Sequence, residues 1–105
     1  MSIRLVFTTL PDAEVAGKLA RQMVELGLAA CVNVLAPCQS VYRWQGVVQE
    51  DGESPLIIKT TAERIPALRD WLVANHPYEL PEFVAVEVAD GLSEYLAWIE
   101  QSTRP

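Results

Sequence analysis

The sequence predicts an α+β domain of the ferredoxin-like kind, a β-α-β-β-α-β sandwich in which two helices cover one face of an antiparallel sheet. Three observations predict it. The apolar segments occur in that order, followed by one more helical segment. The 105 residues suit a single domain over residues 1–105. The stretch from Ser40 to Lys59 is long enough for a hairpin whose strands outrun the helices.

The first strand and helix have clear boundaries in the sequence. Ile3–Thr9 is a mostly apolar, β-rich run that predicts a central strand. Asp12 is placed to cap the following helix, and Gly27 to end it. Leu28–Val34 is a second apolar run and predicts another strand. The apolar residues at helical spacing between the two caps are Val15, Ala16, Leu19, Ala20 and Met23.

A hairpin and a further strand are expected next. Ser40–Trp44 and Val47–Glu50 are extended segments that flank a Gln45-Gly46 turn. Asp51-Gly52 predicts a second break in the chain. Leu56–Thr61 then predicts the next strand.

The second half of the chain repeats the helix and strand pattern. A second helix is expected from Ile65 onward, with Pro66 in its first turn and its end before Pro77. Phe83–Val88 alternates and predicts a strand. A short C-terminal helix follows, with Ser93 or a neighbour as its cap. Its apolar positions are Tyr95, Leu96, Trp98 and Ile99.

Composition limits the function classes. The formal charge of −6 argues against a binder of nucleic-acid phosphates and is compatible with cations or cationic partners. Half of the residues are hydrophobic, which is high for a soluble domain of this size and predicts a subunit interface.

The sequence also predicts a cytoplasmic protein that does not enter the membrane. It shows no secretory signal pattern and no apolar run of membrane-spanning length. Cys31 and Cys38 are therefore expected to be reduced thiols. Their spacing and the single histidine do not form a recognisable zinc motif.

The stretch His76–Glu82 concentrates the chemistry of the chain. It contains the only histidine, two carboxylates and two prolines, so it predicts a stiff loop with an imidazole, a phenol and two acids. One interpretation is a functional loop, and the other is a rigid connector between a helix and a strand.

Six short motifs occur in a fixed order along nearly the whole chain. On these motifs the sequence resembles the CutA divalent-cation tolerance proteins. The motifs are Thr8-Thr9-x-Pro11-Asp12, Leu28-Ala29-Ala30-Cys31-Val32-Asn33, Ser40-x-Tyr42-x-Trp44-x-Gly46, Glu53-x-x-Leu56-x-x-Lys59-Thr60, His76-Pro77-Tyr78-Glu79-x-Pro81-Glu82 and Gly91-x-x-x-Tyr95-Leu96-x-Trp98-Ile99.

The resemblance implies a PII-like homotrimer in which the long hairpin of each subunit reaches a neighbour and its strands join across the interface. It also implies a role in copper or divalent-cation tolerance, a response to metal ions, and no catalytic reaction. No tightly bound cofactor is expected, and copper or another divalent cation is the candidate ligand.

Three positions depart from the family pattern. Val47 replaces a basic residue that is common after the Trp-x-Gly turn. Pro55 is expected to bend its strand or to force a bulge. Thr8 occupies a position that is a cysteine in some relatives, so one soft copper ligand is missing.

The candidate metal ligands are His76, Cys31, Glu79 and Glu82. Each of the first two has a structural alternative. Cys31 also fits a small buried hydrophobe in an apolar strand. His76 also fits a helix-ending residue whose ring bonds a backbone carbonyl.

The candidate interface and ligand-cleft residues are Tyr42, Trp44, Lys59, Glu53 and Tyr78. Tyr42 and Trp44 are two residues apart, so they share one face of a strand and are expected to anchor a subunit contact. Lys59 is expected to pair with Glu53 or with a carboxylate of the His76–Glu82 stretch, or to meet an anionic ligand.

Two functional hypotheses follow. The first is a trimeric cation-tolerance protein that binds metal weakly at clefts between subunits. The second is a PII-like sensor or scaffold that binds a small ligand or a partner protein and has no physiological metal. The sequence shows none of the common catalytic signatures, so an enzyme is not expected.

Overall fold

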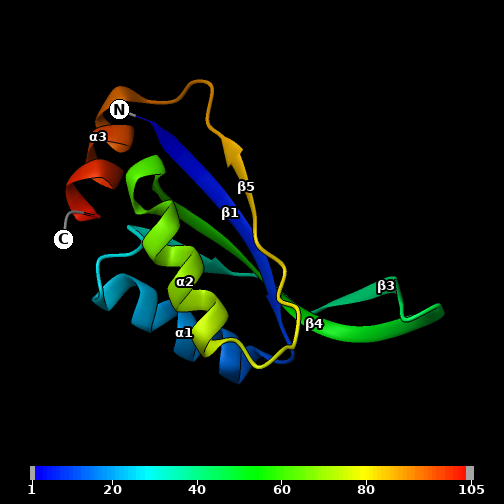
Figure 1. Ribbon diagram of the computed structural model, residues 1–105. Coiled ribbons are helices and arrows are strands. Elements are labelled where there is room, and N and C mark those ends of the chain that lie inside the picture. The colour runs from blue at the N-terminus through cyan, green and yellow to red at the C-terminus, as the bar shows by residue number, and fades with distance from the viewer. Residues whose placement is uncertain (1, 104–105) are drawn as a thin grey trace.

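The structure is a computed structural model that describes residues 2–103. Its helices and strands follow the predicted order (Figure 1). They are β1 (Ile3–Leu10), α1 (Ala13–Glu25), β2 (Cys31–Val34), β3 (Cys38–Trp44), β4 (Val47–Thr61), a short 3-10 turn (Ala62–Arg64), α2 (Ile65–Asn75), β5 (Val84–Glu87) and α3 (Ser93–Ser102).

The sheet has the strand order β2-β4-β1-β5, and all its pairings are antiparallel. β3 lies off this path and pairs with β4 beyond the end of β2. Together with the two helices on one face, this arrangement confirms the predicted ferredoxin-like α+β fold. No helix within residues 2–103 is both long and apolar enough to span a membrane.

The main core lies between the sheet and the helices α1 and α2. Alternate residues of β1 and β4 point into it, as the two-residue period of a strand requires. Each fully buried aliphatic side chain contributes about 1.5–3 kcal/mol through burial. The core residues include Val6, Leu10, Leu19, Met23, Leu56, Ile58 and Leu68.

The predicted caps of α1 are both present. The side chain of Asp12 accepts a hydrogen bond from the Val15 backbone N–H at 2.9 Å. Gly27 has a φ of +71°, and the N–H groups of Gly27 and Leu28 bond to the carbonyls of Val24 and Met23. This paired capping pattern needs a left-handed residue, which explains the glycine. Because the cap uses Leu28, the second strand begins at Cys31 and not at Leu28 as predicted.

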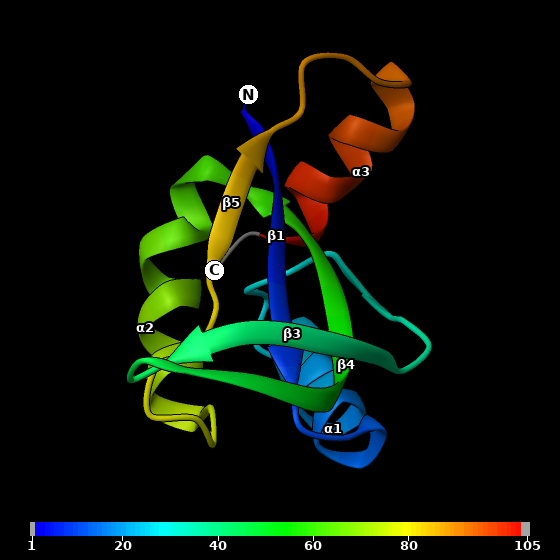
Figure 2. The same ribbon diagram turned by 90° about the vertical axis from the view of Figure 1, so that its right-hand side faces the viewer.

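β3 and the facing part of β4 form an arm, residues 38–53, that projects from the body (Figure 1). The arm points toward the viewer in Figure 2 and makes the chain elongated, with extents of 44 × 25 × 24 Å. Gln45 and Gly46 form the predicted turn, with φ values of +51° and +82°. The predicted break at Asp51-Gly52 is wrong, because both residues pair with β3 and β4 continues through them.

The prediction that Pro55 bends or bulges its strand is also wrong. The register between β1 and β4 is unbroken, and Pro55 lies opposite Thr9. The Pro55 carbonyl accepts a bond from the Leu35 N–H, so its hydrogen-bonding edge faces the link between β2 and β3. The missing proline N–H therefore falls where the neighbouring strand is already interrupted.

The end of the sheet near the N-terminus is closed by α3. Ile99 of α3 packs with Ile3 and Ala30 in a second small core. Leu92 is the N-cap residue and offers no side-chain bond, so Ser93 begins the helix without capping it.

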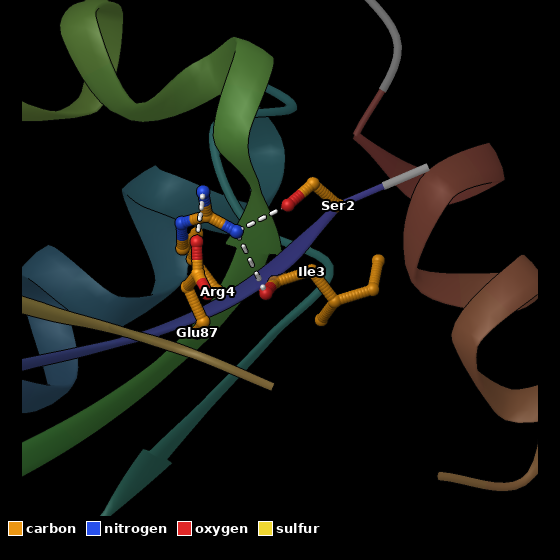
Figure 3. Close-up of polar contacts among 4 residues, drawn as sticks. All are labelled: Ser2, Ile3, Arg4 and Glu87. Carbon is orange, nitrogen blue, oxygen red and sulfur yellow. Dashed lines mark hydrogen bonds and ion pairs between the residues drawn. The ribbon is translucent and has the colours of Figure 1, made fainter. Parts of the chain in front are cut away.

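An ion pair links the inner strand β1 to the edge strand β5. Arg4 and Glu87 lie directly opposite each other on β1 and β5, and their charged groups are 3.3 Å apart (Figure 3). Glu87 is exposed, so this pair contributes little to stability.

Two glycine substitutions test the origin of the α1 boundary. Gly27→Ala should destabilise the fold by about 1–2 kcal/mol, because alanine is strained at positive φ. Gly17→Ala, at an exposed position inside the same helix, should instead stabilise it by about 0.5–1 kcal/mol. Denaturant unfolding of both variants measures the difference. Equal effects of the two substitutions would contradict the capping role of Gly27.

Candidate functional site

A groove of about 1020 Å³ lies where the arm meets the body. One wall is formed by the arm, and the other by the 77–82 loop that connects α2 to β5. Six of the nine predicted site residues line it: Tyr42, Trp44, Glu53, Tyr78, Glu79 and Glu82. The groove therefore joins two stretches of chain that the sequence places far apart.

The lining of the groove is acidic and aromatic. Its carboxylates are Asp51 and Glu53 on the arm and Glu79 and Glu82 on the loop. None of its lining residues is lysine, arginine or histidine. The negative charge of these walls is therefore not neutralised from within the groove, and the groove should attract cations.

His76 ends α2 and lies behind the loop, with 8% of its surface exposed. Its Nε2 is 2.8 Å from the Thr9 carbonyl oxygen, and its Nδ1 accepts a bond from the Tyr78 backbone N–H at 3.1 Å. Because a carbonyl can only accept, Nε2 must carry the proton and donate it. Nδ1 accepts a bond and so carries no proton, which makes the ring neutral. Burial lowers the pKa of His76 below its ordinary value and favours this neutral form.

His76 therefore matches the structural alternative, a helix-ending histidine bound to a backbone carbonyl. Both ring nitrogens are already engaged within the chain, so ligation of a metal by His76 requires one of these bonds to break. Metal ligation by His76 stays a prediction, and it requires the loss of the bond to Thr9 or to Tyr78.

Tyr78 connects the two walls of the groove. Its hydroxyl donates a hydrogen bond of 2.8 Å to the Glu53 carboxylate on β4. Burial and this bond raise the pKa of the Tyr78 phenol, so the phenol remains protonated and continues to donate. On the arm, the Tyr42 hydroxyl donates in the same way to Asp51, and that bond raises the pKa of Tyr42.

Asp51 is the carboxylate of the lining that the sequence analysis missed. The sequence predicts a break in the chain at Asp51-Gly52, whereas both residues belong to β4. The signal that could have found it is the two-residue period of the strand, which places Asp51 on the same side as Glu53.

Cys31 and Lys59 lie elsewhere. They face each other across β2 and β4, and neither lines the groove. Lys59 donates to the Tyr95 hydroxyl at 3.2 Å and lies 5.6 Å from the centre of that ring. The expected ion pair of Lys59 with a glutamate is not found among residues 2–103. Cys31 and Cys38 are both free thiols, and Cys31 is only partly buried.

The carboxylates of the groove do not converge on one point. Within the part of the chain that the structure describes, no group of three or more histidine, cysteine, aspartate or glutamate residues is placed to hold a metal ion. A tight metal centre needs several donor atoms around one position. Residues 2–103 of a single subunit therefore do not form such a centre.

His76 should make the stability of the protein depend on pH. The pKa of His76 is lower in the folded protein than in the unfolded chain, so the neutral ring stabilises the fold. This stabilisation is fully present above the unfolded pKa of 6.5 and is lost as the pH falls through the folded pKa. Chemical unfolding of the wild type and of His76→Gln between pH 7.5 and about 5 measures this. As the pH falls, the free energy of unfolding should decrease more steeply for the wild type than for the variant. Parallel curves of unfolding free energy against pH would contradict a buried, neutral His76.

Removing the Tyr78 hydroxyl tests the link between the walls. Tyr78→Phe should lower the free energy of unfolding by about 1–2 kcal/mol, because it leaves the part-buried carboxylate of Glu53 without this donor. Tyr42→Phe is the matched control, because its carboxylate partner is exposed to water, and its effect on unfolding should be small. An equal loss in both variants would show that Tyr78 does not hold the loop.

Comparison with known proteins gives a consistent result. The CutA1 divalent ion tolerance protein family matches residues 4–102. A divalent-cation tolerance protein CutA from Thermus thermophilus is 46% identical over 99 residues, which cover 94% of this chain and 96% of that protein. The human protein CutA is 42% identical over 97% of this chain, which spans 57% of the human protein's length.

Solved structures agree with the sequence comparison. The divalent cation tolerance protein from Thermus thermophilus superposes with a TM-score of 0.94 at 45% identity, over 97% of this chain and 99% of that one. CutA1 from Oryza sativa superposes with a TM-score of 0.96 at 40% identity, over 99% of this chain and 95% of that one. On the family match, the sequence identity and the shared fold, this chain belongs to the CutA1 divalent ion tolerance protein family.

Proposed function

We propose that this protein contributes to divalent-cation tolerance by binding copper or another divalent cation weakly in the groove, as a subunit of a homotrimer. The observation that carries the proposal is the acidic lining of the groove without any basic side chain. The names of the relatives support the family-level role.

Glu79 and Glu82 are the proposed metal ligands, because both line the groove and neither side chain forms an ion pair among residues 2–103. His76 would serve by fixing the loop that carries them. Cys31 lies outside the groove, and Thr8 is buried and not part of its lining. A carboxylate site of this kind suits a hard divalent ion better than Cu(I).

Exposed apolar surface supports the proposed assembly. Val84 and Val86 on β5 are 51% and 40% exposed, and they share a sheet face with the partly exposed Leu5, Phe7 and Ile57. The arm adds further exposed apolar side chains outside the groove, among them Val47 and Val48. Exposed apolar side chains grouped on one sheet face are typical of protein–protein interfaces, and a subunit interface would bury them.

The second candidate function is a PII-like sensor or scaffold that binds a small ligand and no physiological metal. The scattered carboxylates favour it, because they do not form a metal centre within the described subunit. The volume of the groove is also sufficient for an organic ligand. In both candidate functions the protein binds without catalysis, and a cytoplasmic location is proposed with them.

The proposed assembly predicts the effect of truncating Trp44. Trp44→Ala should lower the melting temperature and release monomer, because the arm would lose a large interface side chain. Size-exclusion chromatography with light scattering and thermal unfolding measure both effects. A trimer of unchanged melting temperature would place the interface elsewhere.

The proposed metal site predicts that Glu79→Gln with Glu82→Gln weakens Cu(II) binding at least fivefold. The matched control is Glu25→Gln with Asp70→Asn, which removes the same charge from exposed positions of α1 and α2. His76→Gln should change the affinity less than the groove variant. Native mass spectrometry with copper counts the ions bound per trimer. Equal weakening by the groove and control variants would mean that only net charge attracts the metal.

A further inference from the structure

The four carboxylates of the groove are distributed along its two walls. Asp51 and Glu53 are two residues apart on β4, and Glu79 and Glu82 are three residues apart on the facing loop. A small metal ion binds most tightly where several oxygen ligands converge on one point. The described residues contain no such group of side chains. Separated negative charges are matched better by a ligand whose positive charges are also separated.

The lining of the groove also contains aromatic and proline rings. Tyr42, Trp44 and Tyr78 contribute aromatic rings, and Pro77 and Pro81 contribute two pyrrolidine rings. Aromatic faces bind the methylene groups of an aliphatic chain, and they attract an ammonium group through the cation–π interaction. The lining therefore combines anionic and apolar contacts for one elongated molecule.

The tyrosine hydroxyls hold two of the carboxylates in place before any ligand arrives. Tyr42 donates to Asp51, and Tyr78 donates to Glu53. Each ionised carboxylate can still accept further hydrogen bonds, because it has about four acceptor positions. An ammonium group could thus bind Asp51 or Glu53 without displacing the tyrosine, and little reorganisation would be needed.

We propose that the groove binds an aliphatic polyamine, whose ammonium groups contact the carboxylates of both walls and whose methylene chain lies on the aromatic and proline rings. This ligand class rests on the second candidate function, in which the groove is a small-ligand site. It adds the chemistry that the ligand must have: two or more positive charges, spaced along a flexible apolar chain.

Isothermal titration at low ionic strength, with spermidine as the probe, tests the proposal. Spermidine should bind at least tenfold more tightly than butylamine, which has one charge, and than Mg²⁺, which has no apolar chain. The double variant Glu79→Gln with Glu82→Gln should bind spermidine at least tenfold more weakly than the wild type. The matched control is Glu25→Gln with Asp70→Asn, and its affinity for spermidine should stay within twofold of that of the wild type.

A second measurement uses the unmodified protein and does not depend on how a variant folds. Spermidine should shift the indole N–H resonance of Trp44, which lines the groove, and leave those of Trp71 and Trp98 in place. Absence of binding, equal loss in groove and control variants, or shifts at Trp71 or Trp98 alone would overturn the proposal. Copper binding in the groove without spermidine binding would overturn it while the metal function stands.

Discussion

The continuity of β4 is the constraint on which the rest of the structure depends. One strand of 15 residues pairs with β1 and β2 in the body and with β3 in the arm. Its body half is anchored by buried Leu56 and Ile58, so the arm extends from the core and not from a hinge. Glu53 lies at the junction, which fixes one wall of the groove to the core.

The opposite wall depends on a short network of hydrogen bonds. Pro77 and Pro81 limit the backbone of the loop, and His76 attaches its beginning to the end of β1 at Thr9. Tyr78 then reaches across the groove to Glu53. The unusual concentration of functional groups in this stretch thus has two uses. His76 and Tyr78 hold the loop through hydrogen bonds, while Glu79 and Glu82 line the groove and are the ligands that the proposed function assigns to it.

The sequence was a good guide where the signal is local or periodic. The Asp12 and Gly27 caps, the Gln45-Gly46 turn and the apolar periods of β1 and α1 were all readable from neighbouring residues. It misled where pairing with a distant strand decides the outcome. Asp51-Gly52 and Pro55 look like breaks, yet Asp51 and Gly52 pair with β3, and the Pro55 carbonyl bonds to Leu35 in the link between β2 and β3. The Tyr95 partner of Lys59 is 36 residues away and leaves no local signal.

In the proposed function, the acidic groove attracts cations although residues 2–103 contain no cluster of three or more side chains placed to hold a metal ion. Crystals soaked with Cu(II) and measured on both sides of the copper absorption edge test this claim most directly. The account predicts that the strongest anomalous peak lies in the groove, beside Glu79 and Glu82. A strongest peak at Cys31, at Cys38 or on the outer faces of the helices would contradict it.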